Sequence, residues 1–195
     1  GFESTIEACE KSLNRLNCDY IDLYLVHWPL REKRNHSWKA FIELRERGLC
    51  KSIGVSNFTI EHLAEIEAKF GILPAVNQVE FHPYYYQKEL LDYCNSKNII
   101  IEAYSPLAHA KRLDEPKLGA ISEELGKTPA QVLIRWSIQR GMVVLPKSVN
   151  KSRIIENFSV FDFDISDSVM AKLDELDESF VTCWDPHNPP PYAPV

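Results

Sequence analysis

The amino-acid sequence predicts an α/β fold made of repeated β-α units, of the (β/α)8 barrel type, with about five of the eight strands in this chain. Short runs rich in β-branched and aromatic residues alternate with amphipathic helical segments, which is the pattern of a parallel sheet. These runs start at nearly regular intervals. Several of them end in polar residues, as barrel strands do at the edge that carries the functional site.

Six helices are predicted from capping residues and from apolar residues at helical spacing. Two begin with a capping box, at Ser4 to Glu7 and at Thr128 to Gln131. Thr59 begins another and Gly71 ends it. The other starts are Ser37, Gln87 and Ser166, and a short extra helix fits between Lys111 and Leu125.

The predicted strands cover residues 20–27, 51–56, 75–80, 99–104 and 142–145. Each is short and almost continuously hydrophobic, so we expect parallel strands that are covered on both faces. The glycines form neither G-x-G-x-x-G nor G-x-x-x-x-G-K-[S/T], which argues against a doubly wound nucleotide-binding sheet or a P-loop. We expect residues 1–195 to form part of one barrel domain, with an irregular tail at 180–195.

Composition excludes several kinds of protein. The net charge of −6 argues against nucleic acid or an anionic membrane as a partner, and no apolar run is long enough to span a bilayer. The five cysteines lack a C-x-x-C pair and the six histidines lack H-x-H or H-x-x-x-H spacing, so we predict neither disulfides nor a metal site. These features favour a cytoplasmic protein.

The sequence begins with Gly1, and its only methionines are Met142 and Met170. Five predicted strands are also too few for a barrel. We therefore expect a fragment, a processed form or an incomplete gene model, with three β-α units missing upstream.

Polar groups follow every predicted strand. They are His27, Ser56-Asn57, Asn77-Gln78 with Glu80 and His82, Tyr104-Ser105 and Lys147-Ser148. Alternation places Ile21, Leu23, Leu25 and His27 on one face of the first strand. In a barrel these groups would meet at the carboxyl-terminal edge of the sheet.

Five ordered blocks resemble the aldo-keto reductase family. They are "LNCDYIDLYLVHWP", "IGVSNF", "VNQVEFHPY", "EAYSPL" and "LPKSVNKSRIIENF", in family order and at family spacing. The resemblance covers nearly the whole chain. It implies a (β/α)8 barrel, NADPH or NADP+ as cofactor, reduction of small aldehydes or ketones to alcohols, and a monomer at full length.

The resemblance assigns His27 to the active site, where a neutral imidazole orients the substrate carbonyl by a hydrogen bond. Trp28 would line the substrate pocket. Taken alone, "VHWP" is better explained by a hydrogen-bonded core histidine and a packed aromatic ring. The companion blocks favour the catalytic interpretation.

Several residues match those that bind the nicotinamide half of the cofactor. Ser56, Asn57 and Gln78 would hold the carboxamide, because hydroxyl and amide groups both donate and accept hydrogen bonds. Turn capping is the alternative for Ser56-Asn57. Tyr104 would stack on the nicotinamide ring.

Other residues match the binding sites of the phosphates and the adenine. Ser105 and Leu107 would contact the pyrophosphate, although the family often has glycine followed by serine or glutamine where this chain has Ala108-His109. The pocket for the 2′-phosphate would consist of Lys147, Ser148, Val149 and Arg153, beside a helix that starts near Asn150. Glu156 and Asn157 would lie on the adenine side. A solvated basic patch is the alternative.

The segment from Phe180 to Pro191, including Trp184, matches the variable loop that shapes substrate preference. No position matches the family's general-acid tyrosine or its lysine and aspartate partners. We therefore expect this chain alone to be inactive. The alternative is a non-catalytic barrel fragment that binds a nucleotide or a partner.

Overall fold

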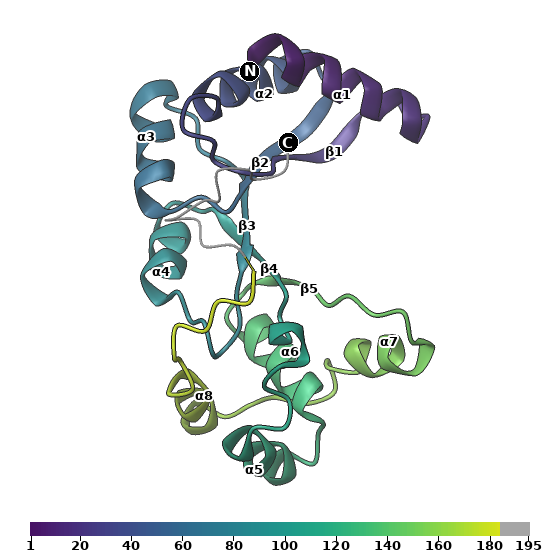
Figure 1. The fold of residues 1–195 in the computed structure, drawn as a ribbon, viewed down its shortest axis with the longest axis vertical. Coiled ribbons are helices and arrows are strands. Elements are labelled where there is room, and N and C mark those ends of the chain that lie inside the picture. Colours follow the sequence, from purple (N-terminus) through teal and green to yellow (C-terminus); the bar gives the residue numbers. More distant parts are fainter. Residues whose placement is uncertain (184–195) are drawn as a thin grey trace. The chain divides into compact units, whose positions relative to one another are not determined.

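The computed structural model describes residues 1–183, which divide into two compact units (Figure 1). Unit 1 contains residues 1–78 and 90–100, and unit 2 contains residues 79–89 and 101–183. Strands β3 and β4 each contribute residues to both units.

The described chain alternates strands and helices, as predicted. The strands are β1 (Ile21–Val26), β2 (Cys50–Ser56), β3 (Val76–Glu80), β4 (Ile100–Tyr104) and β5 (Val143–Leu145). They form one sheet in the order β1-β2-β3-β4-β5, and the register of β1 with β2, β2 with β3 and β4 with β5 is parallel. The helices are α1 (Phe2–Leu16), α2 (Arg34–Glu46), α3 (Ile60–Phe70), α4 (Lys88–Ser96), α5 (Pro116–Leu125), α6 (Pro129–Gln139), α7 (Lys151–Phe158) and α8 (Asp167–Asp174), with a short 3₁₀ helix at Ala108–Ala110.

Side-chain caps mark the helix starts that were predicted best. Thr59 and Thr128 are N-caps whose hydroxyls accept hydrogen bonds from the backbone three residues later. Ser166 is the N-cap residue of α8, as predicted, but its side chain makes no capping hydrogen bond. Two predicted starts were wrong. Helix α1 starts at Phe2 rather than after Ser4, and α2 starts at Arg34, so that Ser37 lies inside it. The first turn of α2 is held by contacts of Arg34 and Asn35 with Glu65 in α3, which no local pattern can indicate.

The outer strands of the sheet are more exposed to solvent than predicted. Strands β2 and β3 are mostly buried, but β1 is half-buried, and Val143 and Leu145 of β5 are 44% and 41% exposed. Among the described residues, β1 pairs only with β2 and β5 only with β4. The expectation that every strand is covered on both faces was therefore wrong for β1 and β5, and also for the inner strand β4, where Ile100 is 49% exposed.

One face of β1 packs against α2 in unit 1. The Tyr24 ring stacks on Phe41 of α2 at a centroid distance of 4.8 Å, so Leu23 and Leu25 occupy the opposite face, as the alternation predicted. At Gly54 in β2, an added Cβ atom would lie 2.5 Å from Leu25 Cδ2 and 2.9 Å from the Val76 carbonyl oxygen. Glycine is therefore needed for the close packing of these three strands.

Candidate functional site

The ends of β1, β2 and β3 in unit 1 are joined by neutral polar side chains. Asn57 Nδ2 donates to the His27 carbonyl oxygen at 3.2 Å and to Ser56 Oγ at 3.1 Å. Ser56 Oγ in turn donates to the Gln78 carbonyl oxygen at 2.8 Å, and the Asn57 amide donates to the same oxygen at 2.9 Å. Four residues that the sequence singled out therefore lie together. We call His27, Ser56, Asn57 and Gln78 the strand-end group.

The backbone of Asn57 explains why asparagine follows β2. Its φ is 62°, in the left-handed region that asparagine tolerates better than most residues do. Phe58, the residue after Asn57, is held by the side chain of Asn77. Asn77 Nδ2 donates to the Phe58 carbonyl oxygen at 2.9 Å, and Asn77 Oδ1 accepts from the Phe58 backbone amide at 3.3 Å. Asn77 was predicted as one of the polar groups that follow the strands, but without a specific role, although it stands beside Gln78 in the "VNQ" run.

His27 and Trp28 border a cavity of about 410 Å³ whose walls come from α1, β1, α2 and the loop before α2. The His27 side chain is exposed, whereas Trp28 is buried. An exposed imidazole at a cavity wall can donate a hydrogen bond to a bound molecule.

In unit 2, β4 ends at Tyr104 and a sharply bent turn follows. Tyr104 is half-buried, and burial raises the pKa of its phenol, so the ring is neutral at physiological pH. Ser105, Ala108, His109 and Ala110 all have positive φ, between 48° and 62°. Ser105 Oγ lies 3.0 Å from His109 Nε2. We call residues 105–110 the pyrophosphate turn, after its predicted role.

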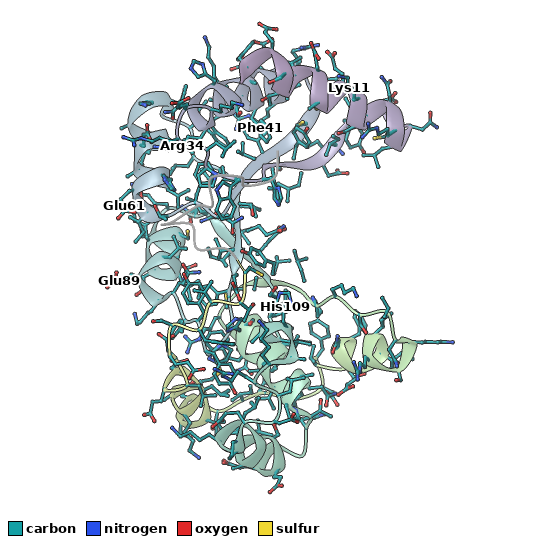
Figure 2. All side chains as sticks on the ribbon, in the orientation of Figure 1. Lys11, Arg34, Phe41, Glu61, Glu89 and His109 are labelled. Carbon is teal, nitrogen blue, oxygen red and sulfur yellow. The ribbon has the colours of Figure 1, made fainter. Side chains whose placement is uncertain are left out.

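A second cavity, of about 560 Å³, lies wholly within unit 2, and we call it the phosphate cavity. Seven of the predicted cofactor residues line it: Ser105, Leu107, Lys147, Ser148, Arg153, Glu156 and Asn157. Val149 is not among the lining residues, and its side chain is 87% exposed. His109, which the sequence noted only as a departure from the family, also lines the cavity; its side chain is labelled in Figure 2.

The phosphate cavity suits an anion. Lys147 and Arg153 are exposed, and no residue of the described chain forms an ion pair with either. Asn150 caps α7, with its Oδ1 accepting from the amides of Ser152 and Arg153 at 2.9 and 3.4 Å. Two cations without an ion-pair partner in the described chain, beside a helix N-terminus, favour a phosphate group.

Part of the predicted substrate loop can be placed. Residues 180–183 are described, whereas Trp184 and the rest of the proline-rich tail lie outside the described residues. Within the described chain, no helix is long and apolar enough to cross a membrane.

Comparison with known proteins gives one consistent family. The Aldo/keto reductase family model matches residues 3–178. A glyoxal reductase of Bacillus subtilis is 48% identical over 178 residues, which cover 91% of this chain and 64% of that protein. A 9,11-endoperoxide prostaglandin H2 reductase of Trypanosoma cruzi is 46% identical over 191 residues, covering 96% of this chain and 68% of that protein. The chain thus spans about two thirds of the length of these curated relatives.

Comparison with solved structures indicates the same family. A variant of Gox0644 crystallised with NADPH has a TM-score of 0.91 and 40% identity, covering 96% of this chain and 70% of the other. A Bombyx mori aldo-keto reductase in complex with NADP has a TM-score of 0.87 and 31% identity, covering 94% and 66%. These structures and the five-stranded parallel sheet confirm the predicted fold class.

Proposed function

The chain belongs to the aldo/keto reductase family, and on this premise we propose that it forms part of an enzyme that reduces aldehydes or ketones to alcohols with NADPH. The observation that carries the proposal is the phosphate cavity, where Lys147 and Arg153 face the solvent without a partner among the described residues. The NADPH and NADP complexes of the solved relatives support it.

Each part of the cofactor has a matching set of side chains. Ser148, Lys147 and Arg153 would bind the 2′-phosphate, which NADH lacks, and Ser105 with Leu107 would contact the pyrophosphate. Ser56, Asn57 and Gln78 would hold the carboxamide, and hydrogen bonds already set the positions of the Ser56 and Asn57 side chains. Tyr104, as a neutral ring, would stack on the nicotinamide.

The bound cofactor would supply a hydride to the carbonyl carbon. His27 would orient the carbonyl by donating a hydrogen bond to its oxygen, and Trp28 and residues 180–191 would shape the substrate pocket. The oxygen also needs a proton, and no residue of this sequence matches the tyrosine that gives it in the family. We therefore expect the 195 residues alone to show little turnover, since losing a positioned acid lowers a rate by roughly 10² to 10⁴.

The proposal is tested by titrating the protein with NADPH and NADH and then assaying a panel of aldehydes. We expect NADPH to bind more tightly than NADH, with turnover only when the chain is extended with the upstream strands of a full-length relative. Tight binding by both forms of the protein without turnover by either would favour the non-catalytic alternative. Equal affinity for the two cofactors would contradict the assigned 2′-phosphate site.

A further inference from the structure

Glu80 is a buried carboxylate at the end of β3 that the proposed reaction does not use. It is 3% exposed. Its Oε1 accepts from the Thr182 amide at 2.9 Å and from the Thr182 hydroxyl, and its Oε2 accepts from the Cys183 amide at 2.9 Å. His82 Nε2 lies 3.2 Å from Oε1. Burial alone would raise the pKa of Glu80, but these hydrogen bonds outweigh it and lower that pKa, so the group is charged.

The segment that Glu80 holds is also attached along its length to the loop after β3. We call residues 177–183 the strap. Asp177 Oδ1 accepts from the Tyr86 amide at 3.2 Å, and the Tyr84 carbonyl oxygen accepts from the amides of Glu178 and Phe180 at 3.3 and 2.8 Å. All of these residues belong to unit 2.

The strap reaches the pyrophosphate turn at its far end. Cys183 Sγ lies 3.2 Å from His109 Nε2 and 3.5 Å from Ser105 Oγ. Ser105 and His109 both line the phosphate cavity. Arg112, just after the turn, donates to Glu178 Oε1 at 2.7 Å, and its guanidinium lies 3.8 Å from the centre of the Phe180 ring. The strap therefore contacts one wall of the cavity.

That wall needs outside support. Four residues of the pyrophosphate turn that are not glycine have positive φ, and each costs roughly 1–2 kcal/mol relative to ordinary backbone. Such conformations persist only where surrounding contacts hold them. Cys183 supplies one such contact, and its own backbone is fixed by Glu80.

We propose that Glu80 is a positioning residue that anchors the strap against the pyrophosphate turn and so slows release of a dinucleotide from the phosphate cavity. A carboxylate suits this position because two amides and a hydroxyl donate to it, and it only accepts. Glutamine would direct one of its own N–H donors toward these donors. Aspartate keeps the charge but is one methylene shorter.

The anchoring is tested by amide hydrogen exchange, which needs no cofactor. In Glu80→Gln we expect exchange at Thr182 and Cys183 to accelerate by about ten-fold or more, because tenfold corresponds to about 1.4 kcal/mol and charged hydrogen bonds are usually stronger than this. Glu175→Gln, an exposed residue with the same change of charge, should leave these rates unaltered. Unchanged exchange in Glu80→Gln would overturn the proposal.

Folding is monitored in the same experiment by protection of α6. If the amides of α6 also lose protection from exchange in Glu80→Gln, the variant is unfolded, and Thr182→Val then tests the proposal. It removes the hydroxyl donor alone, and we expect roughly three-fold faster exchange at Cys183, as for one weak hydrogen bond. No change in this variant would count against Glu80 as the anchor. Glu80→Asp should restore part of the protection.

The effect on cofactor release rests on the proposed function and is measured by stopped-flow dissociation of NADPH. We expect Glu80→Gln to release NADPH about ten-fold faster, in proportion to the loss of strap protection, with little change in the preference for NADPH over NADH. Faster amide exchange in the strap with an unchanged rate of NADPH release would show that Glu80 anchors the strap but does not slow release of the cofactor. If the unaltered protein does not bind NADPH, both the proposed function and the role of Glu80 in cofactor retention are wrong. Amide hydrogen exchange still tests whether Glu80 anchors the strap.

Discussion

The strand-end group of unit 1 and the phosphate cavity of unit 2 hold their polar side chains in opposite ways. Ser56 and Asn57 are buried, and their side chains hydrogen-bond to neighbouring strand ends. Lys147 and Arg153 are exposed and form no ion pair within the described chain. The Ser56 and Asn57 side chains have a fixed geometry without a ligand, whereas the two cations of the phosphate cavity have charge without a fixed geometry.

The difference matches what each region would recognise. A carboxamide is neutral, so selectivity for it depends on donors and acceptors at set positions. A phosphate dianion attracts cations over longer distances and tolerates mobile side chains. Substitutions in the cavity should therefore change ligand affinity with little change in stability, and substitutions in the strand-end group should change stability.

Removing both cavity cations should have the largest effect. In Lys147→Ala combined with Arg153→Ala, we expect NADPH affinity to fall by about 100-fold or more, since each charged hydrogen bond contributes about 1.5–3 kcal/mol. NADH affinity should change far less. Lys151→Ala, an exposed lysine outside the cavity lining, is the matched control. Fluorescence titration measures both cofactors, and equal losses for NADPH and NADH would contradict a 2′-phosphate site.

Asn57 should show the opposite behaviour. We expect Asn57→Ala to lower the free energy of unfolding by about 2 kcal/mol, because it removes two hydrogen bonds and places alanine at a positive φ. Asn57→Gly loses the same hydrogen bonds, but glycine adopts the positive φ without strain. We therefore expect the free energy of unfolding to fall by about half as much as in Asn57→Ala. Urea unfolding compares them. Equal losses would mean that the left-handed conformation contributes nothing.

Lowering the pH should reduce the stability of unit 1, because it protonates Glu65, whose carboxylate is hydrogen-bonded to neighbouring side chains. Hydrogen bonds from Lys69, Asn35 and Arg34 lower the pKa of Glu65 to about 2, from an ordinary value of 4.5. Because the folded pKa is lower, this stabilisation is complete above pH 4.5 and is lost as the pH falls toward 2. We expect it to amount to about 1–2 kcal/mol, allowing for the partial exposure of the group.

The check is the pH dependence of unfolding for Glu65→Gln. This variant should lose stability at neutral pH and show a flatter profile below pH 4.5. Glu46→Gln, an exposed residue of α2, should keep the profile of the unaltered protein. A Glu65→Gln profile as steep as that control would show that Glu65 does not cause the acid sensitivity.

The smallest expected effect concerns strain beside the phosphate cavity. Ala110 has a φ of 62° and an exposed side chain, so Ala110→Gly should raise the free energy of unfolding by about 1 kcal/mol. Ala40→Gly, in the interior of α2, should lower it by about the same amount. Thermal unfolding distinguishes the two signs. A loss of stability in Ala110→Gly would mean that the turn is not strained.

Local features of the fold were predictable because their causes are local. Thr59 and Thr128 begin helices where the capping pattern predicted, since a cap hydroxyl binds an amide three residues away. Alternation likewise assigned the two faces of β1. The start of α2 was missed because its first turn depends on Glu65, about thirty residues later in the chain.

The candidate site was predictable as a set of residues but not as a set of contacts. Strand ends and the family resemblance indicated Lys147, Ser148, Arg153 and Ser105. Neither indicated that His109 lines the same cavity, or that Glu80 binds the backbone of Thr182. The pairing of Glu80 with a segment about a hundred residues away depends on the path of the chain, which no spacing in the sequence encodes.

The sequence by itself determined the order and kind of the elements, the polar residues that follow the strands, and the family. The tertiary structure alone decided which strands are covered, which polar groups are already paired, and which cations stay open to a ligand. The physical reason is distance along the chain. Periodicity and capping act within a few residues, whereas burial and pairing depend on segments brought together by folding.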